Sequence, residues 1–257
     1  MAGRRCLLDR APGARGERDM VDAVSSEVAE RLAQVRERVA AAARVVGRDP
    51  EEIELLLAVK TLPAERVREA IDAGARLLGH NRAQELVATA PGLADLPHEM
   101  HFIGRLQSNK AGKVVPLVGC VQSVDSRSLA ERLDRLAARE GRRLDVFAQV
   151  NTSGEATKAG ATPEDAVALA VDLAALPHLR LRGLMAIGAR SDDVDVVRAS
   201  YERLAALRDD VVASGAPGTA DARELSMGMS TDLEVAVAAG ATMVRVGTAV
   251  FGARPTG

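Results

Sequence analysis

A run of aliphatic residues ends in a lysine in the stretch Ile53-Glu54-Leu55-Leu56-Leu57-Ala58-Val59-Lys60. Such a continuous apolar run is typical of a strand that is buried on both faces, as the strands of parallel sheets are. Further strand candidates follow along the chain at 76–79, 99–103, 117–121, 144–150, 180–185, 223–226 and 243–247. Helix candidates alternate with them at 64–73, 81–89, 107–113, 127–140, 163–175, 193–213 and 231–239. This alternation predicts an α/β protein with a parallel sheet.

The number of strand candidates and the length of the chain favour one architecture. Eight strands, each followed by a helix or a turn, in a chain of 257 residues suit a single closed (β/α)8 barrel of the TIM type, which takes about 250 residues. An open doubly wound sheet is the alternative. No G-x-G-x-x-G motif follows the first strand, so a dinucleotide-binding fold is disfavoured.

An extra helix is predicted before the first strand, over residues 22–47. Gly47 ends its pattern, and its apolar residues recur every three or four positions at Val28, Leu32, Val35, Val39, Ala42 and Val46. Residues 1–19 are rich in Arg and Gly. We interpret them as a disordered extension or an over-called start, with Met20 as the initiator. Residues 20–257 are then expected to form a single domain.

The composition excludes several classes of protein. Hydrophobic residues make up 47% of the chain and aromatic residues 2%, so Ala, Val and Leu must fill the core. The net charge of -2 provides no basic field for nucleic acid, and no apolar stretch approaches the ~20 residues of a membrane span. Cys6 and Cys120 lie far apart without metal-type spacing, which fits a reducing cytoplasm. A monomer is expected, because no large apolar surface stripe is evident.

Lys60 is the first candidate functional residue. A buried amine at the end of a strand is costly unless it is paired or neutral, and a depressed pKa makes the amine a nucleophile towards carbonyl carbon. In a closed barrel the carboxyl ends of the strands carry the functional site. The alternative is a lysine that buries only its aliphatic stem and extends its amine into solvent.

Two turns in the last third of the chain have the composition of anion-binding sites. One is Gly247-Thr248, and the other is Ser226-Met227-Gly228-Met229-Ser230, which precedes a predicted helix with Ser230 or Thr231 as its N-cap. Barrels commonly hold phosphate in the loops after strands seven and eight. Together with Lys60, these turns predict a site for a phosphorylated aldehyde, whereas each turn by itself is also compatible with an ordinary glycine turn.

Other residues are interpreted from their position alone. Asn81 opens a predicted helix and is interpreted as its N-cap. Met185 ends the sixth strand, where it either packs in the core or forms a soft wall against a ring. His98 and His101 are not expected to form a metal site, because residues three apart on a strand face opposite sides. No metal is predicted.

In combination these segments resemble the pyridoxal phosphate homeostasis protein family, the single-domain relatives of the alanine racemase barrel. The resemblance extends over about residues 55–252. It is carried by an ordered set of motifs: Val59-Lys60-Thr61; Asn81-Arg82-Ala83-Gln84-Glu85; His101-Phe102-Ile103-Gly104 with Leu106-Gln107 and Asn109-Lys110; Val150-Asn151 with Ser153-Gly154-Glu155 and Lys158; Gly183-Leu184-Met185; and Ser226-Met227-Gly228-Met229-Ser230 through Phe251-Gly252. The chain departs from the family at His80, where Glu is usual, and at Leu62, where Lys is frequent.

The resemblance implies a binding site for pyridoxal 5'-phosphate (PLP). It implies that Lys60 forms the internal aldimine, a Schiff base, with PLP. It also implies that Arg245 faces the pyridine nitrogen and that Asn81 lies beside the ring. The residues expected at the phosphate are Ser226 or Ser230, together with Gly247 and Thr248.

A guanidinium at the ring nitrogen keeps that nitrogen unprotonated, which makes the ring a poorer electron sink. This chemistry and the resemblance together imply a cytoplasmic protein of PLP homeostasis that holds PLP and hands it to PLP-dependent apoenzymes, rather than an enzyme. A racemase is one alternative, but it needs a second acid or base on the opposite face, and Tyr201, the only tyrosine, is predicted on an outer helix. The barrel, the lysine and the phosphate turns would also suit a Schiff-base aldolase acting on a sugar phosphate, and the long N-terminal helix would suit a pure interaction module.

Overall fold

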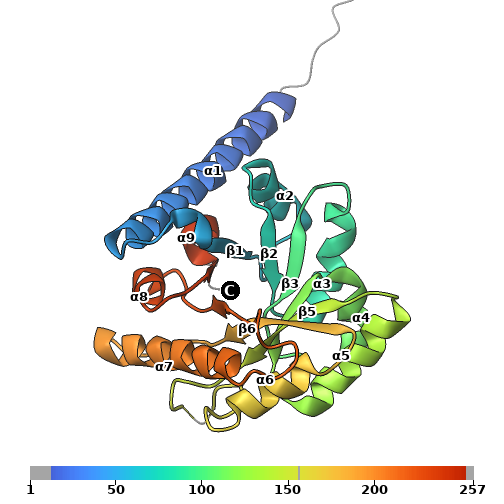
Figure 1. The fold of residues 1–257 in the computed structure, drawn as a ribbon. Helices are drawn as coiled ribbons and strands as arrows, with labels where there is room; N and C mark the ends of the chain where they lie inside the picture. The colour runs from blue at the N-terminus through green and yellow to red at the C-terminus, as the bar shows by residue number, and fades with distance from the viewer. Residues whose placement is uncertain (1–12, 156, 253–257) are drawn as a thin grey trace, which may run out of the picture.

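Eight parallel strands form a closed barrel in a computed structural model that describes residues 13–155 and 157–252 (Figure 1). The strands run in sequence order around the barrel: β1 (Glu54–Ala58), β2 (Leu77–His80), β3 (Glu99–Phe102), β4 (Cys120–Val124), β5 (Leu144–Gln149), β6 (Leu179–Met185), β7 (Glu224–Ser226) and β8 (Met243–Val246). β8 pairs with β1 in parallel, from Glu54 opposite Met243 to Leu57 opposite Val246. This pairing closes the barrel and excludes the open doubly wound sheet.

Helices surround the barrel, as predicted. They are α1 (Gly13–Val45), α2 (Ala64–Asp72), α3 (Ala83–Thr89), α4 (Ala111–Val114), α5 (Arg127–Arg139), α6 (Ala166–Ala174), α7 (Val194–Ala213), α8 (Leu233–Ala238) and α9 (Thr248–Phe251), with short 3-10 turns at Pro50–Glu52, Ala90–Leu93 and Val115–Leu117. The expected N-caps were wrong. Arg82 is the N-cap of α3 in place of Asn81, and Asp232 is the N-cap of α8 in place of Ser230 or Thr231.

The main core lies between the outward faces of the strands and the helices, and aliphatic residues fill it. Helix α5 illustrates why these segments form helices. Four apolar residues at three- and four-residue spacing are buried, namely Leu129, Ala130, Leu133 and Ala137, and Leu136 is partly buried beside them. Burying each leucine contributes about 1.5–3 kcal/mol. The shortage of aromatic residues is therefore met by many closely packed small aliphatic side chains.

Helix α1 packs across the outside of the barrel against α2, α8 and α9 (Figure 1). Its predicted apolar face is buried at five positions, but Val46 is 40% exposed, because the helix ends at Val45 and Gly47 turns the chain at φ +70. Arg38 on the polar side binds Glu234 of α8, with Nε 2.9 Å from Oε1. Helix α1 includes residues 13–19, and residues 1–12 of the expected extension lie outside the described part. The assignment of Met20 as initiator stays a prediction.

The barrel interior is not uniformly aliphatic. At the amino ends of the strands, Asp145 accepts hydrogen bonds from Arg180 and Arg182, and Arg182 also pairs with Glu224. Above this charged end lies a small apolar cluster of Leu56, Cys120, Phe147, Met185 and Met243. Polar side chains return towards the carboxyl ends, where functional sites of this fold lie. No helix within the described ranges is both long and apolar enough to cross a membrane.

Candidate functional site

The carboxyl ends of the strands bring the predicted site residues to one rim of the barrel, which we call the mouth. Lys60 lies two residues beyond β1, and Asn81 directly follows β2. Ser226 is the last residue of β7 and Arg245 lies in β8. Gly247 and Thr248 follow β8 at the start of α9. Residues far apart in the sequence thus meet, because all parallel strands of a barrel point the same way.

The backbone around Lys60 has an uncommon conformation. Lys60 is partly buried, and Thr61 after it has a φ of 62°, in the left-handed region that non-glycine residues avoid at a cost of roughly 1–2 kcal/mol. Two hydrogen bonds hold this turn. The amide of Thr61 donates to Oε2 of Glu85 (3.0 Å), and the hydroxyl of Thr61 donates to the carbonyl oxygen of Lys60 (2.6 Å). The carboxylate on α3 therefore fixes the point from which the lysine side chain extends.

Asn81 is held by a close backbone contact with the loop after β3. A Cβ at Gly104 would lie 2.0 Å from the carbonyl oxygen of Asn81, so only glycine allows this approach. The side-chain oxygen Oδ1 of Asn81 is buried and has no hydrogen-bond partner among the residues that the structure describes. An orphaned buried acceptor is rare and costs about 1–3 kcal/mol. It is the kind of group that a donor on a bound ligand would satisfy.

Arg245 is the buried cation of the mouth, with only 6% of its surface exposed. Its Nη1 donates to Oγ of Ser226 (2.8 Å) and its Nη2 to the carbonyl oxygen of Ala186 (2.8 Å). Burial lowers the pKa of Arg245, although a guanidinium stays protonated in proteins. Both acceptors are neutral oxygen atoms, so a ligand with an electron pair to offer would be stabilised beside this charge.

Ser226 and Met185 lie deeper than the sequence indicates. Ser226 is fully buried, and its hydroxyl donates to Oε1 of Gln122 (2.7 Å) while it accepts from Arg245. Met185 is 1% exposed and belongs to the apolar cluster of the interior. Ser230 is partly buried and Thr248 is exposed, so their hydroxyls lie nearer the surface.

Four functional candidates were missed by the sequence analysis or given no role. Gln122 and His101 lie inside the barrel and connect to Ser226 by hydrogen bonds. Tyr201 comes from an outer helix, α7, yet it is fully buried and its hydroxyl donates to Oδ2 of Asp232 (2.9 Å). Oδ1 of Asp232 in turn accepts from the amide of Met229 (2.6 Å) and thereby fixes the loop after β7. No local pattern marks these side chains, since each acts through distant partners.

His80, where this chain departs from the family pattern, lies behind the mouth. It is fully buried, and Nε2 lies 2.8 Å from the hydroxyl oxygen of Thr89 on α3. Burial lowers the pKa of His80 to about 4, against a smaller opposing effect of Glu85. The imidazole is therefore neutral at physiological pH and has a structural contact with α3.

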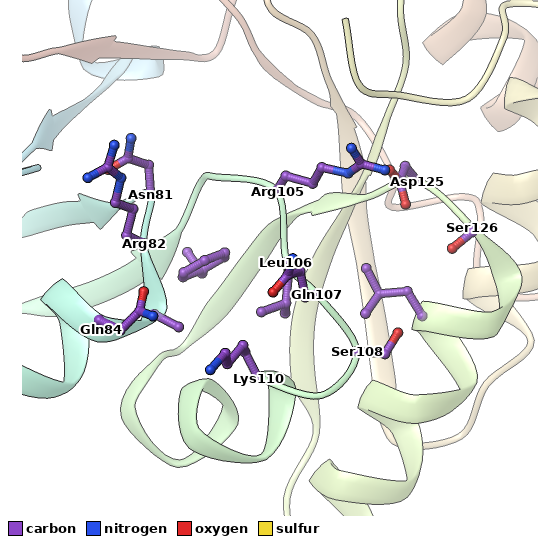
Figure 2. A pocket seen from close by; sticks show the side chains of 13 residues that line it. Asn81, Arg82, Gln84, Arg105, Leu106, Gln107, Ser108, Lys110, Asp125 and Ser126 are labelled. Atoms are coloured by element: carbon purple, nitrogen blue, oxygen red, sulfur yellow. The ribbon is translucent and has the colours of Figure 1, made fainter.

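A cavity of about 550 Å3 opens beside Asn81, between the loops that follow β2, β3 and β4. Figure 2 shows Arg82, Arg105 and Lys110 around it, with Arg105 directed towards Asp125. The mouth therefore continues outwards from Asn81 along a wall with more cations than carboxylates.

Fold and site together define the class to which the protein belongs. It is a (β/α)8 barrel with a lysine after the first strand and a buried arginine in the last. The family model described as alanine racemase, N-terminal domain, matches residues 31–255, which is most of the chain. The same relationship appears in individual relatives.

The pyridoxal phosphate homeostasis protein of Pseudomonas aeruginosa is 45% identical over 232 residues, which cover 90% of this chain and 98% of that protein. An unknown protein from Bifidobacterium adolescentis has a similar structure, with a TM-score of 0.86 and 43% identity over 90% of this chain and 96% of that one. PipY of Synechococcus elongatus PCC7942, solved with PLP bound, has a TM-score of 0.75 and 38% identity over 88% of this chain and 100% of that one. The chain belongs to the pyridoxal phosphate homeostasis protein family.

Proposed function

We propose that this protein binds PLP at the mouth of the barrel and holds it through Lys60 as part of intracellular PLP homeostasis. The observation that carries the proposal is the meeting of Lys60, Asn81 and Arg245 at one rim, in a chain whose relative PipY was solved with PLP bound. Condensation joins Nζ of Lys60 to the aldehyde carbon by a C=N bond and releases one water molecule.

Several other residues of the mouth have a proposed contact with PLP. Arg245 directs its charge at the ring nitrogen, and the orphaned Oδ1 of Asn81 lies beside the ring. The hydroxyl of Ser226 is occupied by Gln122, so we assign the phosphate contacts to Ser230, Gly247 and Thr248. These three lie after β7 and β8, where barrels of this fold frequently hold phosphate. Met185 supports the site from the interior.

Holding PLP, rather than turning over amino acids with it, is the role that the residues support. A cationic neighbour disfavours protonation of the ring nitrogen, and an unprotonated ring stabilises carbanions less. The hydroxyl of Tyr201 is bound to Asp232, and burial, with the nearby Asp232 charge, raises its pKa well above the usual value. Tyr201 is thus poorly suited to accept a proton near neutral pH. We propose a cytoplasmic monomer that delivers PLP to PLP-dependent apoenzymes.

One spectrum tests the proposal. Purified protein saturated with PLP should keep, after dialysis, the absorption band of the bound cofactor at the edge of the visible range. Borohydride should reduce the C=N bond to a secondary amine, which links PLP to the protein permanently. Mass spectrometry of peptides should place that link at Lys60. The Lys60→Ala variant should lose both the absorption band and the borohydride-stable link to PLP. The Lys113→Ala variant, with its change on helix α4, should keep both.

Two results would refute the proposal: a wild-type protein without the band, or a Lys60→Ala variant that retains it after dialysis. Trapping of a sugar phosphate by borohydride with no PLP bound would indicate a Schiff-base aldolase instead. Rapid exchange of the α-hydrogen of an amino acid with solvent deuterium would indicate a racemase.

A further inference from the structure

A line of hydrogen-bonded polar side chains crosses the barrel interior from the mouth towards the opposite end. It starts at Arg245 on β8 and passes to Ser226 on β7 (2.8 Å) and then to Gln122 on β4 (2.7 Å). Gln122 continues to Nδ1 of His101 on β3 (2.7 Å), and Nε2 of His101 reaches Oε1 of Glu99 (3.0 Å). We call these five side chains the interior relay.

The chemistry of the two ends fixes the direction of every hydrogen bond in the interior relay. The guanidinium of Arg245 can only donate, so Ser226 accepts from it and directs its own proton to Oε1 of Gln122. The amide nitrogen of Gln122 then donates to Nδ1 of His101. Since Nδ1 accepts, the proton of a neutral imidazole is on Nε2 and is donated to the carboxylate of Glu99.

The reverse orientation of the Gln122 amide is chemically unfavourable. It would place the amide nitrogen against Ser226, which would leave the hydroxyl proton of Ser226 without its acceptor. It would also require Nδ1 of His101 to donate, so that a neutral imidazole would present an unprotonated Nε2 to Glu99. In the observed orientation Nε2 of Gln122 donates its second hydrogen to Sδ of Met243, with 3.0 Å between the nitrogen and the sulfur, so both N–H donors are used.

The interior relay is buried, apart from its far end. Gln122 and Ser226 are 0% exposed, His101 is 5% exposed and Arg245 is 6% exposed, beside an otherwise apolar interior cluster. Barrels of this fold usually fill their interior with branched aliphatic residues, which have no polar groups to desolvate on burial. The hydrogen bond from His101 lowers the pKa of Glu99, so the relay ends on an ionised carboxylate at neutral pH.

We propose that Gln122 and His101 are positioning residues that hold the Arg245 guanidinium in the orientation required at the ring nitrogen of PLP. The inference rests on the proposed function. A serine hydroxyl rotates freely, and it offers its lone pair steadily to Arg245 only while its proton is bound elsewhere. Gln122 is the acceptor that binds this proton, and His101 fixes the amide of Gln122. The interior relay therefore ties the guanidinium of Arg245, at the end of a flexible side chain, to side chains that the rigid strands of the barrel hold in place.

The main test replaces Gln122 by methionine, which has a similar length and volume but neither donates nor accepts as the amide does. We expect Gln122→Met to fold, to bind PLP about tenfold more weakly, which corresponds to about 1.4 kcal/mol, and to shift the absorption maximum of the bound cofactor. Cys120→Ala is the matched control, because Cys120 is equally buried in the interior without belonging to the relay. It should change the Kd less than about twofold and leave the maximum in place.

A second pair of variants tests His101 separately. His101→Asn places a side-chain oxygen close to the position of Nδ1, so Gln122 keeps an acceptor, whereas His101→Leu removes it. We expect the asparagine variant to bind PLP within about threefold of wild type and the leucine variant to resemble Gln122→Met. In ligand-free wild-type protein, nitrogen-15 NMR should show His101 as the Nε2–H tautomer, and Gln122→Glu should change that tautomer or protonate the ring.

Several outcomes would overturn the proposal. If Gln122→Met and His101→Leu lower only the melting temperature, with Kd and absorption maximum equal to those of Cys120→Ala, the relay is merely structural. An Nδ1–H tautomer of His101 in the ligand-free wild type would reverse the direction of the hydrogen bond between Gln122 and His101. That result would refute the proposed relay, and it does not depend on PLP binding. Failure of the wild type itself to bind PLP would instead refute the proposed function, so the two failures are distinguishable.

Discussion

Acidification should destabilise the protein through His80 in particular. The imidazole is fully buried against Thr89, and its pKa falls from 6.5 to about 4 because burial disfavours the charged form. The unfolded chain therefore binds a proton at a higher pH than the folded chain does. A group whose pKa is lowered on folding contributes stability above the unfolded pKa, and that stability is lost as the pH falls from about 6.5 towards about 4.

The size of the effect follows from the linkage between pKa and folding. Between pH 7.5 and pH 5.0 the unfolded histidine becomes almost fully protonated, while the folded one stays mostly neutral. At about 1.36 kcal/mol per pKa unit, this single group lowers the free energy of unfolding by about 2 kcal/mol over that interval. Below about pH 4 the folded imidazole also binds its proton, so this contribution levels off.

The assay is urea unfolding at pH 7.5 and pH 5.0, with wild type and His80→Gln in the same state of cofactor loading. Glutamine does not titrate and can still donate from Nε2 towards Thr89. All other titratable groups are common to both proteins, so the difference between the two pH-dependent losses isolates His80. We expect wild type to lose about 2 kcal/mol more than the variant. Equal losses, or an NMR titration of His80 near 6.5, would show that burial does not hold this imidazole neutral.

Two further predictions concern the walls of the mouth. Gly104→Ala should destabilise the protein by about 1–3 kcal/mol and weaken PLP retention, because the new Cβ would lie 2.0 Å from the carbonyl oxygen of Asn81. Gly112→Ala in α4 is the control, since its Cβ would meet only a side-chain carbon of Leu136 in α5, 3.9 Å away, and thermal unfolding should show no loss of stability. Tyr201→Phe removes the hydrogen bond to Asp232, so urea unfolding should show that the free energy of unfolding falls by about 1–2 kcal/mol, and dialysis should release PLP faster. An unchanged rate of PLP release would show that the loop after β7 does not depend on this hydrogen bond.

The barrel could be predicted from the sequence because its strands and helices are encoded locally. The aliphatic run that ends at Lys60 and the periodic apolar residues of α5 depend on neighbours a few positions away. Errors occurred at the ends of helices, where Val46 is exposed and Arg82 and Asp232 are the N-caps. Capping geometry and packing determine the residue at which a helix begins or ends, and a short segment of sequence specifies both only weakly.

Sequence alone determined that Lys60 and the turns after the seventh and eighth strands would meet, since parallel strands in one barrel must end at one rim. What each side chain does at that rim depends on the tertiary structure. Ser226 reaches a glutamine 104 positions away, and Tyr201 reaches inward from an outer helix to Asp232. Such contacts join elements that are neighbours only after the barrel has closed, so their hydrogen bonds depend on strand register and inward orientation that no local pattern records.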